Sequence, residues 1–82
     1  MSDAGAANGE VVSTLTEYWE ELVLAAPVSP AERLLDVGGN SLIATMLGNR
    51  IELTWGIRPS LEELLTFSFG ELSGWCSEHL PA

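Results

Sequence analysis

Residues 38–42 are the part of this sequence whose types and spacing are best suited to chemistry. They read Gly-Gly-Asn-Ser-Leu, and an apolar pattern with helical spacing begins directly after Ser41. Ser and Asn are common N-cap residues and glycine is common in the loop before a helix, so the segment also fits an ordinary capped helix. In either case the Ser41 hydroxyl is expected at or beside a helix N-terminus, where unpaired backbone N–H groups and the helix dipole favour an anion such as a phosphate.

The other reactive residue types give little support for catalysis by this chain. Serine is a weak nucleophile without an adjacent base, and the only histidine, His79, lies near the far end of the sequence. Cys76 falls on an apolar helical stripe and is expected to pack in the core. The acidic residues are scattered, and none of their spacings is typical of a metal site. We therefore expect no catalytic residue and no bound metal, and a protein that is not an enzyme.

Composition limits the possible partners. The chain has 82 residues, enough for one small domain, and 12 acidic residues against 3 basic ones give a net charge of −9. Nucleic acids and anionic membranes repel such a surface, whereas basic protein surfaces attract it; the same charge also keeps a small protein soluble. A single cysteine excludes an internal disulfide, and no apolar run approaches the roughly 20 residues that span a bilayer. We expect a soluble, cytoplasmic protein.

Apolar residues that recur at spacings of three and four predict an all-α fold, because no segment alternates convincingly with a period of two. The expected helices cover residues 10–24, 41–55, 61–65 and 69–80. The fold class is thus a small four-helix bundle, with three longer helices, one short third helix and a long first loop. We expect this loop to travel the length of the bundle, so that the first two helices run broadly parallel. Residues 1–9 are expected to form a flexible tail, and residues 10–82 the folded domain.

Local signals mark where the helices begin and end. Ser29, Ser60 and Ser68 are each followed three residues later by Glu, which predicts a capping box and one helical turn or more at each. Gly56 is the expected left-handed end of the second helix. Gly48, inside that helix, is explained either by a close contact with another helix or by a partner that approaches there.

The stretch from Leu34 to Leu42 resembles the attachment motif of carrier proteins in the acyl carrier protein-like superfamily. It is most similar to the thiolation, or peptidyl carrier, domains of nonribosomal peptide synthesis. Trp19, the Trp-Gly-Ile run that begins at Trp55, and the final capped helix follow the order seen in that family. The resemblance covers roughly residues 11–80.

This resemblance implies that Ser41 receives 4′-phosphopantetheine from coenzyme A, through a separate phosphopantetheinyl transferase. The surrounding motif residues would be Asp36, Gly38, Gly39, Asn40 and Leu42. The thiol of the arm would hold an amino acid or peptide as a thioester. An adenylating enzyme would load the cargo onto the arm. Condensation, tailoring or thioesterase enzymes of secondary-metabolite biosynthesis, such as antibiotic synthesis, would then act on the loaded carrier. Because family members often have Asp or His where Asn40 stands, the resemblance leaves the cognate transferase open.

The resemblance also implies a partner-binding face on the second helix. Leu42, Met46 and Asn49 lie on one side of this helix at spacings of four and three. The alternative is that Leu42 and Met46 are core residues. Two other functions are considered: an acyl carrier protein for polyketide, fatty or aryl cargo, and a helical adaptor without a prosthetic group. We expect a free-standing, monomeric carrier.

Overall fold

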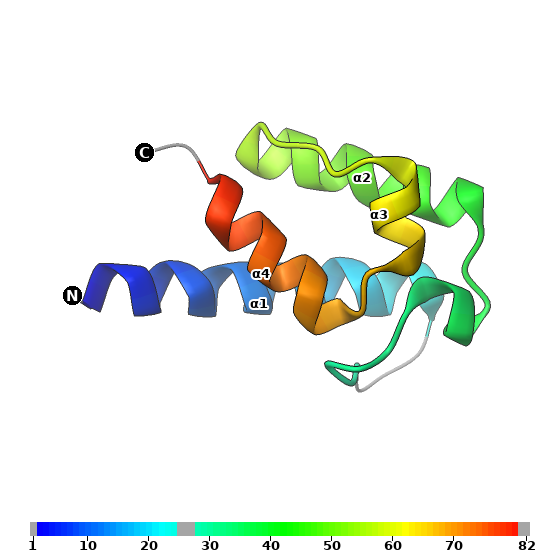
Figure 1. Cartoon of the computed structure of the whole chain (residues 1–82), viewed down its shortest axis with the longest axis horizontal. Helices are drawn as coiled ribbons and strands as arrows, with labels where there is room; N and C mark the ends of the chain where they lie inside the picture. Colours follow the sequence, from blue (N-terminus) through cyan, green and yellow to red (C-terminus); the bar gives the residue numbers. More distant parts are fainter. Residues whose placement is uncertain (1, 25–27, 81–82) are drawn as a thin grey trace.

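The computed structural model describes residues 2–24 and 28–80. The described part contains five helical elements and no strand; one isolated antiparallel bridge joins Arg33 to Ser68. In chain order the elements are α1 (Ser2–Val23), the 3₁₀ helix η1 (Leu34–Val37), α2 (Ser41–Trp55), α3 (Leu61–Thr66) and α4 (Phe69–His79) (Figure 1). The predicted fold class, a small all-α bundle with a short third helix and a long first loop, is therefore confirmed. None of the described helices is long and apolar enough to cross a membrane.

The helix α2 runs opposite to α1, and α4 crosses α1 obliquely (Figure 1). The expected parallel arrangement of the first two helices is therefore wrong. The described part of the first loop, residues 28–40, instead stays at the end of the bundle where α1 ends and α2 begins, and it pairs with the start of α4. The N–H of Phe69 donates to the carbonyl of Glu32 at 2.7 Å, and the N–H of Gly70 donates to the carbonyl of Pro30 at 2.8 Å. The loop is long because it pairs with the unsatisfied N–H groups of another helix.

One apolar cluster joins all five elements. Its members are Val11, Leu15, Trp19, Leu34, Ala44, Leu47, Ile51, Leu64, Phe69, Leu72 and Cys76. The Trp19 ring is fully buried and meets Phe69 edge-on, with 5.4 Å between the ring centroids. Its indole N–H donates to Oε2 of Glu32 at 2.6 Å. The first loop therefore reaches the core through the apolar residues Val28 and Leu34 and through the carboxylate of Glu32.

The first helix begins earlier than predicted. It starts at Ser2, so the predicted helix start at residue 10 is wrong. Residues 2–9 include three alanines, the best helix formers, and extending a helix that tertiary packing already holds avoids the cost of nucleation. Residue 1 lies outside the described residues. The flexibility of residues 1–9 stays a prediction.

Two of the three predicted capping boxes are present. Ser60 caps α3 and Ser68 caps α4, each with reciprocal bonds to the Glu three residues later. The box predicted at Ser29 is wrong, because the Glu32 side chain turns to the buried indole of Trp19 instead. Ser29 keeps two other bonds, since its Oγ accepts the N–H of Ala31 at 3.4 Å and its carbonyl accepts the N–H of Glu32 at 3.0 Å.

Gly48 and Gly56 shape α2 and its end. Gly56 adopts the predicted left-handed conformation, with φ of 74°. A Cβ at Gly48 would lie 3.0 Å from Cδ1 of Leu64 in α3. The close helix contact therefore accounts for the glycine inside α2.

Candidate functional site

Two glycines shape the turn between η1 and α2. Gly38 ends η1 in the left-handed region, with φ of 84°, where L side chains are strained. Gly39 is required for a different reason. Its N–H donates to the carbonyl of Leu34 at 2.7 Å, and a Cβ at this position would lie 2.7 Å from the same oxygen and 2.9 Å from Cβ of Leu34. The turn thus passes closely over the residue that anchors η1 in the core.

The next residue, Asn40, caps α2. Its Oδ1 accepts the N–H of Ile43 at 3.0 Å, and its carbonyl accepts the N–H of Ala44 at 2.9 Å. Ser41 is therefore the first helical residue. Within the described part of the chain, the N–H groups of Ser41 and Leu42 have no acceptor, as expected for the first turn of a helix. No acidic residue occupies this turn, so the positive end of the helix dipole is open to an anion.

The Ser41 side chain is exposed at this helix end. Its hydroxyl makes no hydrogen bond with the residues that the structure describes, while its carbonyl accepts the hydroxyl of Thr45 at 2.8 Å. An incoming phosphate donor can therefore reach Oγ from solvent. A phosphodiester formed there would lie next to the two unpaired N–H groups, so the site fits a phosphate-linked prosthetic group.

The histidine and the cysteine of this chain both lie on α4, away from the turn before α2. His79 ends α4, at the end of the bundle opposite to the start of α2 (Figure 1). There it stacks on Trp75, with 4.0 Å between centroids, and its Nδ1 lies 2.8 Å from the Trp75 carbonyl oxygen. Burial raises the pKa of the Cys76 thiol to about 12, which keeps the thiol protonated and unreactive. Among residues 2–24 and 28–80, no group of three or more His, Cys, Asp or Glu could hold a metal ion.

Asp36 lies in η1 and is exposed. Its backbone N–H donates to the carbonyl of Arg33 at 3.0 Å, a turn bond that precedes the glycine pair. The structure therefore brings Asp36, both glycines and Asn40 into one continuous turn that leads to Ser41.

Apolar side chains line the exposed side of α2. Leu42 is 68% exposed and Met46 is 39% exposed, so the reading of these two residues as core is wrong. Asn49 is also exposed, and its Oδ1 accepts the guanidinium of Arg58 at 2.6 Å. Sequence reasoning missed Leu53, which is 87% exposed and continues the same stripe. The signal was present, because Leu53 follows Met46 at seven residues and Asn49 at four.

Comparison with known proteins identifies the family. A family model described as phosphopantetheine attachment site matches residues 13–75, which include the turn, Ser41 and all of α2. No curated protein and no solved structure matches the chain. Members of this family carry 4′-phosphopantetheine covalently, generally catalyse no reaction themselves, and act with partner enzymes after a phosphopantetheinyl transferase has modified them. The chain belongs to the phosphopantetheine attachment family and is a phosphopantetheine-carrying carrier protein.

Proposed function

We propose that Ser41 is the attachment residue and that the protein carries an amino acid or peptide as a thioester in secondary-metabolite biosynthesis. One observation supports the assignment of Ser41 as the attachment residue. The Ser41 hydroxyl is exposed at the N-terminus of α2, beside two unpaired N–H groups and with no acidic residue in the first turn. These features favour a phosphate on this oxygen.

The chain's part in the modification is to present a nucleophile. Oγ of Ser41 attacks the β-phosphorus of coenzyme A, a P–O bond to Ser41 forms, and adenosine 3′,5′-bisphosphate leaves. We assign the serine proton to a base of the transferase, because the Ser41 hydroxyl makes no hydrogen bond to a base among the described residues. The start of α2 is held in one conformation by Gly38, Gly39 and Asn40, so the Ser41 side chain is presented to the transferase in a fixed position.

When bound, the arm supplies a terminal thiol that forms the thioester. The only cysteine of this chain is buried with a raised pKa, so it does not compete for acyl groups. The similarity of residues 34–42 to thiolation domains supports an aminoacyl or peptidyl cargo. A polyketide, fatty or aryl cargo is the alternative, and the loading enzyme distinguishes the two.

We further propose that Leu42, Met46 and Asn49 contact the partner enzymes, together with Leu53. Their exposure on one side of α2, which begins at the attachment serine, supports this assignment. Methionine suits a surface that must accept several partners in turn, because its flexible side chain adapts to different shapes. A reducing cytoplasm, which suits a chain with one free thiol, is the proposed location.

Two experiments test this function. The protein is first incubated with coenzyme A and a broad-specificity phosphopantetheinyl transferase, and its intact mass is measured. The wild type and Ser13→Ala, a control at an exposed serine of α1, should each gain one phosphopantetheinyl group. Ser41→Ala should gain none, and modification of Ser41→Ala would overturn the assignment.

The second experiment addresses the cargo. The modified protein is offered to adenylating enzymes with ATP and either amino acids or fatty or aryl acids, and the thioester is detected by mass. Aminoacylation supports the peptidyl carrier. If the protein accepts only fatty or aryl acids, the peptidyl carrier assignment is wrong and the acyl carrier alternative holds.

A further inference from the structure

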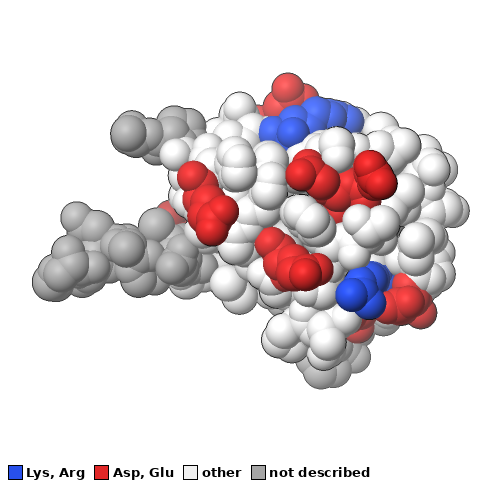
Figure 2. Space-filling model, in the orientation of Figure 1, with Lys and Arg blue, Asp and Glu red and all other residues white. Residues whose placement is uncertain are grey.

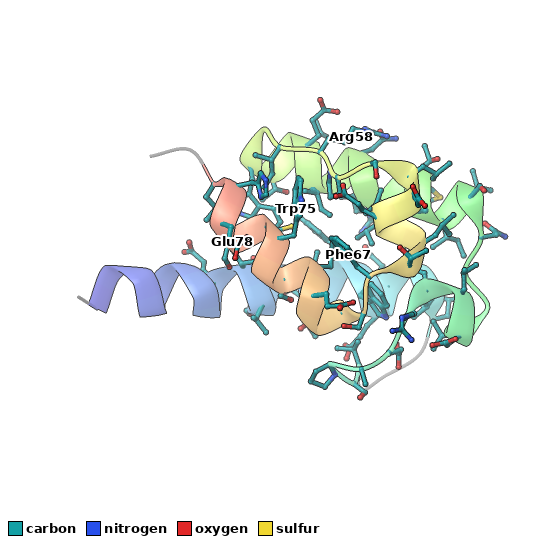
Figure 3. The ribbon with its side chains drawn as sticks, in the orientation of Figure 1. Arg58, Phe67, Trp75 and Glu78 are labelled. Carbon is teal, nitrogen blue, oxygen red and sulfur yellow. The ribbon has the colours of Figure 1, made fainter. Side chains whose placement is uncertain are left out.

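A hollow lies on the outer side of α4, away from the attachment turn. Its volume is about 280 Å³, and its lining residues are Phe67, Glu71, Gly74, Trp75 and Glu78. Figure 3 shows Phe67 and Trp75 beside α4, with Glu78 further towards the C-terminal end of the helix. Gly74 leaves space here, because a Cβ at this position would meet nothing within 4 Å. The hollow is therefore shallow, solvent-accessible and able to accept a side chain.

Two aromatic residues, both half-buried, form the apolar part of this hollow. Phe67 caps the C-terminus of α3 and packs against the core cluster. Trp75 also packs against the core, and its ring stacks on His79 with 15° between the ring planes. These contacts hold both rings in place, and the part of each ring that stays exposed is open to a ligand.

Two carboxylates complete the lining. Glu71 and Glu78 are seven residues apart on α4, about 10 Å along the helix axis, and both are exposed. Oε1 of Glu71 accepts the N–H of Ser68 at 2.8 Å, which orients this carboxylate and leaves its second oxygen as an acceptor. Figure 2 shows acidic side chains spread over α3 and α4 on this face of the molecule.

We propose that this hollow is a docking point for an arginine side chain from a basic segment of a partner protein. A guanidinium group stacks on aromatic rings and forms paired hydrogen bonds with carboxylates, so it satisfies both kinds of lining residue at once. The net charge of −9 attracts a basic segment over distance. The site is on α4 rather than on the exposed side of α2, so it is a second contact surface, and it does not depend on a group at Ser41.

The test uses the acetylated, amidated pentapeptide Gly-Arg-Gly-Arg-Gly and the same peptide with citrulline, the neutral isostere, in place of arginine. Each is titrated into the ¹⁵N-labelled full chain at low salt, and amide and indole shifts are followed by NMR. The arginine peptide should give saturable shifts centred on Gly74, Trp75 and Glu78, and the citrulline peptide should give none. Ser41→Ala should bind the peptide as the wild type does.

Three variants separate the hollow from general attraction by the acidic surface. Gly74→Leu fills the hollow from within the helix and should abolish the localised shifts. Glu78→Gln and Glu17→Gln remove the same charge, one at the hollow and one at an exposed position of α1. Glu78→Gln should weaken binding about two- to fivefold more than Glu17→Gln, as expected for an exposed ion pair.

Several results would overturn the proposal. Equal shifts with the citrulline peptide would show that the charge is not recognised. Equal weakening by the two Gln variants, or shifts spread over the acidic residues of α1, would show non-specific attraction. Should Gly74→Leu lose its helical circular dichroism, the pair of Gln variants still decides the outcome.

Discussion

Gly39→Ala is the substitution that the turn before Ser41 should tolerate least. The new Cβ would lie 2.7 Å from the carbonyl oxygen of Leu34 and 2.9 Å from its Cβ. These atoms belong to a fully buried residue and cannot rotate away, so the turn itself must move. Such overpacking costs about 1–3 kcal/mol. The movement also breaks the Gly39 N–H bond to the same oxygen, at about 1 kcal/mol. The expected loss of unfolding free energy is therefore about 2–4 kcal/mol.

Urea unfolding followed by circular dichroism at 222 nm measures this loss. For a small protein with a slope of about 1 kcal/mol per M, the midpoint should fall by about 2 M or more. Gly74→Ala is the matched control, because its Cβ enters open space within a helix and should stabilise the protein by about 0.5–1 kcal/mol. Gly38→Ala should lower the free energy of unfolding by about 1–2 kcal/mol, because φ of 84° strains an L side chain even though the new Cβ would enter open space. A midpoint for Gly39→Ala at or above that of wild type would refute the close approach over Leu34.

Three other outcomes follow from the described contacts. Glu32→Ala leaves the buried indole N–H of Trp19 without an acceptor and should cost about 1–3 kcal/mol in urea unfolding, whereas an unchanged midpoint would mean that another group takes over the bond. Cys76 should resist iodoacetamide at pH 8 in the native protein, because burial raises the pKa of its thiol to about 12, and it should react once the protein is unfolded in about 8 M urea. Rapid labelling of the native protein would contradict this burial. Asn40→Ala should lose about 1 kcal/mol through the missing N-cap, and Asn40→Ser should restore most of it; equal midpoints for wild type and the Ala variant would contradict the cap.

The same raised pKa gives the stability of the protein a definite dependence on alkaline pH. The unfolded thiol ionises near its ordinary pKa of 9.0, while the folded thiol stays protonated to about 12. Because the folded state holds the proton more tightly, the contribution of Cys76 is fully present below pH 9 and is lost as the pH rises from 9 towards 12. Urea midpoints measured from pH 8 to 10.5 should therefore fall more steeply for wild type than for Cys76→Ala, and parallel slopes would contradict this linkage.

Short-range signals in the sequence correctly predicted the end of α2 and the starts of α3 and α4. Gly56, Ser60 and Ser68 each act through bonds within a few residues, so their patterns suffice to place these three boundaries. The fold class follows from helical spacing for the same reason. The N-terminal boundary failed because a run of small residues carries no signal that separates a tail from the continuation of a helix.

Long-range contacts could not be predicted from the same patterns. Glu32 obeys the capping-box spacing, yet its carboxylate bonds to Trp19 thirteen residues earlier, and nothing local favours one partner over the other. The long loop was misread for a similar reason, since its length reflects pairing with the start of α4. At the site, the resemblance of residues 34–42 identified the turn, but only the structure explains why Gly39 in particular has no room for a side chain.

Peptide mapping of the modified protein tests the central claim most directly. Trypsin cleaves after Arg33 and Arg50, and the peptide between them contains Ser41 as its only serine. After incubation with coenzyme A and a phosphopantetheinyl transferase, tandem mass spectrometry of this peptide should place one phosphopantetheinyl group on Ser41. A group found on Thr45 or on any other peptide, with Ser41 unmodified, would contradict the account.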